Sequence, residues 1–211
     1  MMTDKTPSTR NYFDRMADIW DQAGQSDDLR QRLTGLIETF AIPCGGSVLD
    51  VGTGTGILHP YLLNAVGPSG RVLALDFSIR MLSEALKKKR PANLICFQAD
   101  VMAIPLSDRT CDTVICFAAF PHFDQKSQAM QEMVRVAKTD GRVFIAHLMS
   151  RKQIARHHDA NPEVAGHYLP PADTMRRLFT TAGLGDFTLC DEPGLYLAKG
   201  VKHRLPRNHR I

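Results

Sequence analysis

The sequence predicts an α/β fold, a doubly wound and mainly parallel sheet of seven strands with helices on both faces. Two observations lead to this fold class. Short β-type runs alternate with helical stretches along most of the 211 residues. Several of those runs, such as VLDV, VLAL and VFIAHL, are almost continuously apolar, as is expected of strands that are covered on both faces.

The seven predicted strands and the helices between them follow from hydrophobic periodicity and from start and stop signals. The strands are expected at Ser47–Val51, Arg71–Asp76, Asn93–Gln98, Asp112–Ala118, Arg142–His147, Asp186–Cys190 and Leu195–Val201. The helices are expected at Ile57–Ala65, Ser78–Lys89, Gln125–Val136 and Pro171–Ala182. Gly183 follows the last of these helices and marks its end.

Two segments stand outside the alternation of strands and helices. Two amphipathic helical patterns, Tyr12–Asp21 and Leu29–Phe40, precede the first strand. A long polar connection follows the fifth strand, and long connections in compact domains are often functional lids. The expected division is an N-terminal helical cap at 1–46, a domain at 47–201 with a lid insertion at 149–170, and a basic tail at 202–211.

The net charge of +4 is concentrated at the end of the chain. Five basic residues and no acidic ones follow Glu192, and without those five the chain has 21 basic and 22 acidic side chains. Proteins that bind nucleic acids normally carry their excess charge on the folded body. The charge pattern therefore argues against nucleic acid as the main partner. The five basic residues are Lys199, Lys202, Arg204, Arg207 and Arg210.

Composition also predicts a cytoplasmic protein. No apolar run approaches the ~20 residues that a membrane span needs, and the N-terminal stretch MMTDKTPSTRNYFDRM lacks the apolar core of a signal peptide. The five cysteines include no C-x-x-C pair, which fits a reducing compartment and argues against a thiolate metal site.

The most informative stretch is VLDVGTGTGIL, in which a strand that ends in Asp50 leads into three alternating glycines, Gly52, Gly54 and Gly56. Glycines at such a turn let a ligand contact the backbone, and the next helix presents free N–H groups. Asp76 ends the next strand, and a carboxylate there can hold both hydroxyls of a ribose. The expected ligand is therefore a nucleoside derivative.

The details of the loop favour a cationic nucleoside over a dinucleotide. Ile57 occupies the last position of the dinucleotide pattern G-x-G-x-x-G and breaks it. Asp50 suits a positive charge better than a diphosphate. The alternative is that the glycines only form a tight turn, and that Asp76 and Asp100 only cap helices.

The G-x-G-x-G spacing after an acidic residue resembles motif I of the class I S-adenosylmethionine-dependent methyltransferases. Further stretches match the family in order, namely FQADV, AIPLS before CDTVICF, FPHF, EMVRVAKTDGRV and AGL. The resemblance covers roughly Val48 to Val201. The stretch YFDRMADIWD near the N-terminus resembles the opening helix of the quinone-type and related small-molecule members.

The resemblance implies a Rossmann-like methyltransferase fold, a small-molecule acceptor, S-adenosyl-L-methionine as cofactor and S-adenosyl-L-homocysteine as product. In the family, the acid after the third strand meets the adenine amino group and the next residue packs on the ring. The cofactor-binding residues implied are Asp50, Gly52, Thr53, Gly54, Gly56, Asp76, Phe77, Asp100, Val101 and Phe117.

The acceptor half of the site has no universal catalytic residue that could be carried over. His122 and His147 follow the fourth and fifth strands, at the edge where the methyl group would lie. Either could accept a proton or orient an acceptor near neutral pH, and we expect them to be the catalytic residues. The alternative is that they only bind loop backbone.

Three alternatives stay open at this point. His157, His158 and His167, with Asp159 or Glu163, could bind a divalent metal, but their spacing matches no metal signature, so no metal ligand is predicted. The basic tail could guide methylation of RNA or another nucleic acid. The chain could also be a non-catalytic protein that binds a nucleoside or a metal. The oligomeric state is not predicted.

Overall fold

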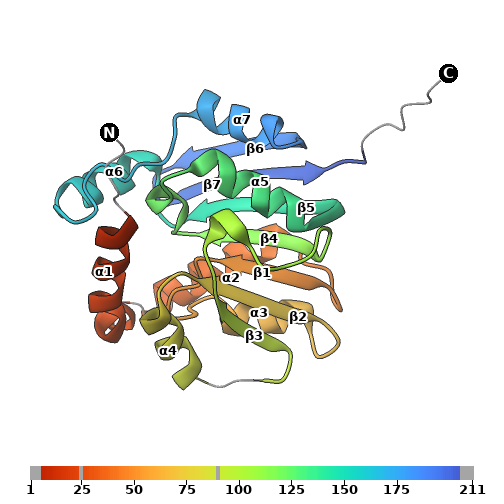
Figure 1. Cartoon of the computed structure of the whole chain (residues 1–211), viewed down its shortest axis with the longest axis horizontal. Coiled ribbons are helices and arrows are strands. Elements are labelled where there is room, and N and C mark those ends of the chain that lie inside the picture. The colour runs from red at the N-terminus through yellow and green to blue at the C-terminus, as the bar shows by residue number, and fades with distance from the viewer. Residues whose placement is uncertain (1–5, 24–25, 89–90, 205–211) are drawn as a thin grey trace.

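The computed structural model describes residues 6–23, 26–88 and 91–204, which contain a single sheet of seven strands (Figure 1). The strands lie in the order β3-β2-β1-β4-β5-β7-β6. The first five are parallel, whereas β7 runs antiparallel to both of its neighbours. The strands are β1 Ser47–Val51, β2 Arg71–Asp76, β3 Leu94–Gln98, β4 Cys111–Phe117, β5 Ala137–His147, β6 Leu184–Glu192 and β7 Leu195–Lys202. The predicted fold class is confirmed.

Helices cover both faces of the sheet because neighbouring strand residues are apolar on both sides. Val48 belongs to a buried cluster with side chains of α2 and α3, whereas Leu49 belongs to a second cluster with side chains of α5 and α7. The helices are α1 Thr6–Met16, α2 Asp27–Phe40, α3 His59–Val66, α4 Ile79–Lys87, α5 Lys126–Val136, α6 Arg151–Asp159 and α7 Ala172–Thr181, and the short 3-10 helices are η1 Ala17–Ala23, η2 Val101–Ala103 and η3 Phe120–His122.

β5 is the strand whose bounds differ most from prediction. It begins at Ala137 rather than at Arg142, because the residues around Asp140 form a bulge inside the strand. Asp140 has a φ of 61°, and the pairing of β5 with β4 shifts between Cys111 and Thr113. The predicted start of this strand was therefore wrong.

The helical segments at the N-terminus and in the lid also depart from prediction. The predicted helix Tyr12–Asp21 is instead α1 followed by η1, and the polar connection at 149–170 contains the helix α6. The start of α6 has a capping box, in which the hydroxyl of Ser150 accepts from Gln153 N and the Gln153 side chain accepts from Ser150 N. A serine followed three residues later by glutamine is a readable helix start that the prediction missed.

The start of the predicted tail at 202 is also corrected, because Lys202 is the last residue of β7. Lys202 Nζ donates to the carbonyl oxygens of Val134, Arg135 and Ala137, at distances of 2.7–3.2 Å. Since β7 is antiparallel, Lys202 lies at the edge of the sheet opposite the tips of the parallel strands. Residues 205–211 of the predicted tail lie outside the described residues.

Among the described residues, no helix has both the length and the apolar character that crossing a bilayer would require. The five cysteines are free thiols.

Candidate active site

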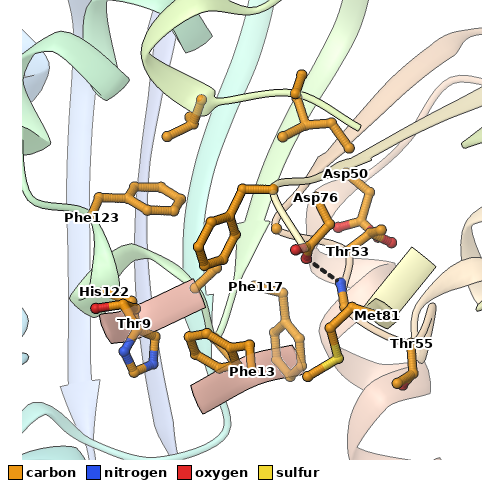
Figure 2. A pocket seen from close by; sticks show the side chains of 18 of the residues that line it. Thr9, Phe13, Asp50, Thr53, Thr55, Asp76, Met81, Phe117, His122 and Phe123 are labelled. Atoms are coloured by element: carbon orange, nitrogen blue, oxygen red, sulfur yellow. Dashed lines mark hydrogen bonds between the residues drawn. The ribbon is translucent and has the colours of Figure 1, made fainter. Parts of the chain in front are cut away.

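A cavity opens at the carboxyl ends of the parallel strands, where the chain order reverses between β1 and β4. Ligands of doubly wound sheets bind at such a switch point. One side of the cavity holds Asp50 and Asp76, and the other holds aromatic rings and His122 (Figure 2). The wall is formed by Thr9, Phe13, Trp20, Asp50, Gly52, Thr53, Gly54, Thr55, Ile57, Leu58, Leu75, Asp76, Phe77, Met81, Ala99, Asp100, Val101, Met102, Phe117, Ala118, Ala119, His122, Phe123 and Asp124.

The glycine loop after β1 has backbone geometry that larger residues would disturb. Gly52 has a φ of +71°, and a Cβ there would lie 2.4 Å from the Cβ of Ala119. Gly54 has a φ of +55°, and a Cβ at that position would meet no atom within 4 Å. Gly54 therefore turns an open backbone face to the cavity that it lines.

Asp76, at the tip of β2, ties this loop to the start of α4. Its Oδ2 accepts from the N–H of Gly54 at 2.8 Å, a bond drawn in Figure 2, and its Oδ1 accepts from the N–H of Ser78 at 2.9 Å. Burial raises the pKa of Asp76 to about 6, and the negative charge of Asp14 adds to the rise. The hydrogen bonds from the backbone of Ser78, Gly54 and Phe77 oppose this rise, because they favour the ionised carboxylate. A cationic ligand beside it would favour the ionised carboxylate.

Asp50, at the tip of β1, begins a short buried chain of polar groups. The hydroxyl of Thr53 lies 2.6 Å from Asp50 Oδ2 and 2.8 Å from His59 Nε2. Burial raises the pKa of Asp50 to about 7, with a smaller contribution from Asp76, and burial lowers the pKa of His59 to about 4. His59 was not predicted, and its position at the start of α3 gave no signal.

The loops after β2 and β3 provide the next part of the wall, where Phe77, Asp100 and Val101 all line the cavity. The side chain of Asp100 accepts from the N–H of Met102 at 2.8 Å and so caps η2. The capping alternative is therefore present in the structure, and it leaves the other carboxylate oxygen of Asp100 available to a ligand.

Helix α1 and η1 form a wall of the cavity through Thr9, Phe13 and Trp20. The ring of Phe13 lies with its centroid 5.6 Å from that of Trp20 and 6.0 Å from that of Phe77. Phe13 in α1 and Trp20 in η1 thus both face the cavity, although they belong to different helices. Thr9 and Met81 were not predicted as lining residues.

His122, at the end of η3, is the one histidine that lines this cavity. Its ring lies beside that of Phe13 (Figure 2), and the two pack edge-on with centroids 5.0 Å apart. Its Nδ1 lies 3.0 Å from Nδ1 of His167. Burial, followed by the neighbouring histidines and Lys126, holds the pKa of His122 well below its usual range.

His147 and Gly56 are the two predicted site residues that do not line the cavity. His147 lies behind Phe117, with ring centroids 6.2 Å apart, and burial lowers its pKa to about 4. A Cβ at Gly56 would lie 2.4 Å from the ring of His59, so this glycine makes room for a packed side chain. The catalytic role expected for His147 stays a prediction without a cavity contact to support it.

No residue of the lid segment 149–170 lines the cavity, and the segment bears on it through the rings of His158 and His167, which pack against His122. His158 and His167 are buried, and Nδ1 of His158 donates to the carbonyl oxygen of His167. His157 is exposed. In the part of the chain that the structure describes, no group of three or more His, Cys, Asp or Glu side chains is arranged to hold a metal ion. No metal ligands were predicted.

The fold and this geometry have counterparts among known proteins. The methyltransferase-domain family matches residues 49–145. The chain is 32% identical over 166 residues to the ubiquinone/menaquinone biosynthesis C-methyltransferase UbiE of Syntrophotalea carbinolica, an alignment that covers 76% of this chain and 66% of that protein. It is 33% identical over 156 residues to the demethylmenaquinone methyltransferase of Lactobacillus johnsonii, covering 68% and 63%. The chain thus spans about two thirds of the length of these curated relatives.

Solved structures show the same fold at lower identity. A SAM-dependent methyltransferase from Aquifex aeolicus superposes with a TM-score of 0.70 at 22% identity, covering 92% of this chain and 98% of that one. An arsenic(III) S-adenosylmethionine methyltransferase from Chlamydomonas reinhardtii gives a TM-score of 0.62 at 17% identity, covering 84% and 74%. These similarities support the fold alone.

Proposed function

The chain belongs to the class I S-adenosylmethionine-dependent methyltransferases, and from this premise we propose that it transfers the methyl group of S-adenosylmethionine to a small, planar, aromatic acceptor. One observation carries the proposal. A half built from backbone groups and carboxylates adjoins an aromatic half with His122 in one cavity (Figure 2).

The polar half fits the cofactor in its charge and its open backbone. Asp50 and Asp76 are 2% and 5% exposed, so their negative charges are poorly solvated until a cation lies beside them. We assign Asp76 to the ribose hydroxyls, Asp100 and Val101 to the adenine, and the loop from Asp50 through Gly54 to the methionine end. S-adenosylmethionine supplies an already activated methyl group when bound.

The residues around the acceptor therefore have three tasks: to align it, to exclude water and to take up a proton where the acceptor must lose one. Phe13, Phe117 and Phe123 provide flat apolar surface for an aromatic ring. His122 is the residue we assign to the proton, since it is the only titratable side chain on this aromatic part of the wall apart from the exposed Asp124.

The names of the relatives extend the proposal to the acceptor class. The proteins from Syntrophotalea carbinolica and Lactobacillus johnsonii are named for the C-methylation of quinones and of demethylmenaquinone. A reduced quinone is a planar ring with ionisable hydroxyls, which suits the aromatic wall and the single histidine. We propose a phenol-like or quinol acceptor on this basis, and a cytoplasmic location for the reaction.

Methylation of nucleic acid is less well supported by the placement of charge. Lys202 binds three carbonyl oxygens at the edge of the sheet opposite the cavity. A polyanion held near this edge would be separated from the cavity by the length of the strands.

The test is transfer of a labelled methyl group. The purified chain is incubated with methyl-tritiated S-adenosylmethionine and a short-chain demethylmenaquinol kept reduced, and the product is identified by mass spectrometry. We expect one methyl group on the ring carbon. Stabilisation of the protein by NADH but not by S-adenosylmethionine would overturn the cofactor assignment, and labelling of RNA but not of any quinol or phenol would overturn the acceptor class.

A further inference from the structure

The lid contributes a histidine that touches the proposed catalytic residue from outside the cavity. His167, which is 8% exposed, does not line the cavity, yet its Nδ1 lies 3.0 Å from Nδ1 of His122. Its own position is fixed by the backbone, since its N–H donates to the carbonyl of Val164 at 3.0 Å and its carbonyl accepts from Nδ1 of His158. The contact is therefore built into the fold of the lid.

The contact between the two Nδ1 atoms can be a hydrogen bond only if one of the two rings carries the proton there. Two ring nitrogens at hydrogen-bonding distance must share one proton, so one of them donates and the other accepts. The bond uses Nδ1 of His122 and leaves its Nε2 as the nitrogen that can meet an acceptor. Whether that Nε2 is a base or a donor depends on which of the two rings carries the shared proton.

We propose that His167 is a positioning residue, which accepts the Nδ1 proton of His122 and so keeps Nε2 of His122 unprotonated and directed to the acceptor. This inference rests on the proposed function. In the reaction, the proton of an acceptor hydroxyl would move to Nε2 of His122, and the ring carbon of the resulting phenolate would bond the methyl carbon, whose bond to sulfur would break with its electron pair left on the S-adenosyl-L-homocysteine product. The methylated ring carbon would then lose its own proton to water, and the oxygen would take back a proton, so that the ring is aromatic again. The Nδ1 bond to His167 then stabilises the imidazolium.

A neutral histidine in this place differs from the carboxylate that usually orients a catalytic histidine. A carboxylate would raise the pKa of His122 and favour its charged form before any acceptor arrives. His167 instead fixes the tautomer without adding a negative charge. The other groups that bear on His122 are His158 from α6, His147 from β5 and Lys126 from α5, and Asp124 lines the same cavity.

The tautomer can be measured directly in the full chain without acceptor. Two-bond proton–nitrogen NMR spectra of the histidine rings, recorded at mildly alkaline pH and assigned with His122→Gln, distinguish the two neutral forms. We expect the proton of His122 on Nδ1 in the wild type and on Nε2 in His167→Leu. A wild-type His122 with its proton on Nε2, or a tautomer unchanged in His167→Leu, would overturn the inference.

The matched pair His167→Asn and His167→Leu tests the consequence for turnover. The amide oxygen of Asn can take the place of Nδ1 as an acceptor, whereas Leu fills the space without one. With the demethylmenaquinol we expect kcat to fall about 10- to 100-fold in His167→Leu and to stay within about threefold in His167→Asn, with the Kd for S-adenosylmethionine unchanged in both. Equal losses in both variants would indicate a packing role only.

His157→Leu is the control, because His157 is an exposed histidine of the same lid segment, near the end of α6, and within the described residues no ring contact or hydrogen bond joins it to His122. The two proposals fail separately. If no quinol or phenol is methylated, the proposed acceptor class is wrong, but the NMR result on the tautomer stands or falls on its own.

Discussion

The two halves of the cavity are built in different ways. The half around Asp50 and Asp76 comes from adjacent strand tips and one loop, held by hydrogen bonds such as the one from the N–H of Gly54 to the side-chain oxygen Oδ2 of Asp76. The aromatic half joins α1, η3 and the lid behind them, segments that are up to 149 residues apart, as in the bond from Asn161 to Tyr12. The half around Asp50 and Asp76 is local, because one short stretch of sequence fixes its geometry. The aromatic half is composite, because it depends on tertiary contacts between distant segments, and these contacts can change without disturbing the glycine loop.

The strongest way to sharpen this comparison is to remove the proposed base. In His122→Phe we expect kcat for methyl transfer to fall about 100-fold or more, because a positioned base typically contributes 10²–10⁴-fold, while the ring stacking is kept. Binding of S-adenosylmethionine, measured by calorimetry, should be unchanged. His147→Phe is the matched comparison, and we expect less than about threefold loss there, because His147 does not line the cavity. Equal losses in the two variants would remove the distinction between them.

Loss of a side chain from the polar half should weaken binding of the cofactor. Asp76→Ala removes the acceptor of two backbone N–H groups and the proposed partner of the ribose. We expect the Kd for S-adenosylmethionine to rise about 100-fold, or ~2.7 kcal/mol. Asp173→Ala, an exposed acid on α7, is the control. A change of less than about threefold in Asp76→Ala would show that the carboxylate does not hold the cofactor.

Phe13 lies where the two halves meet, so its loss should affect both. Its ring contacts those of Trp20, Phe77 and His122. In Phe13→Ala we expect about a 10-fold loss in kcat/KM and a smaller loss in cofactor affinity, since each aromatic contact contributes about 0.5–1.5 kcal/mol. Ile19 lies in η1 and is 47% exposed, so Ile19→Ala should leave both kcat/KM and cofactor affinity unchanged. Loss of cofactor affinity alone would assign α1 to the polar half.

The smallest effect expected is that of pH on the stability of the protein and on its affinity for the cofactor. Burial raises the pKa of Asp50 from 3.8 to about 7 and that of Asp76 to about 6. The folded state therefore binds these protons more tightly than the unfolded state, and the free energy of unfolding falls as pH rises from about 4 to 7. A cationic cofactor favours the ionised carboxylates, so its affinity should rise from pH 6 to pH 8, by about threefold for each half unit by which the bound cofactor lowers their pKa values.

Calorimetric titrations at several pH values measure that slope, and Asp50→Asn should flatten it. An affinity that falls with rising pH would contradict the assignment of the carboxylates to a cation.

The sequence allowed the local half to be predicted well and the composite half only in part. Asp50, Gly52, Gly54 and Asp76 could be read because a strand, a glycine loop and a second strand follow one another, and all four line the cavity. Their roles toward a cofactor remain predictions. His59 was missed because its contact with Thr53 depends on how α3 leaves the loop. The pairing of His122 with His167, 45 residues apart, left no pattern of spacing to detect.

The way α1 is joined to the lid also bears on how fast molecules can be exchanged. Asn161 donates to the hydroxyl of Tyr12 at 3.2 Å, and Arg15 forms an ion pair with Glu163. Helix α1, which lines the cavity, is therefore bound to the lid, which does not line it. A substrate or product that passes on this side must first separate α1 from the lid. Opening of this joint, rather than the bond-making step, would then set the residence time of a bound product.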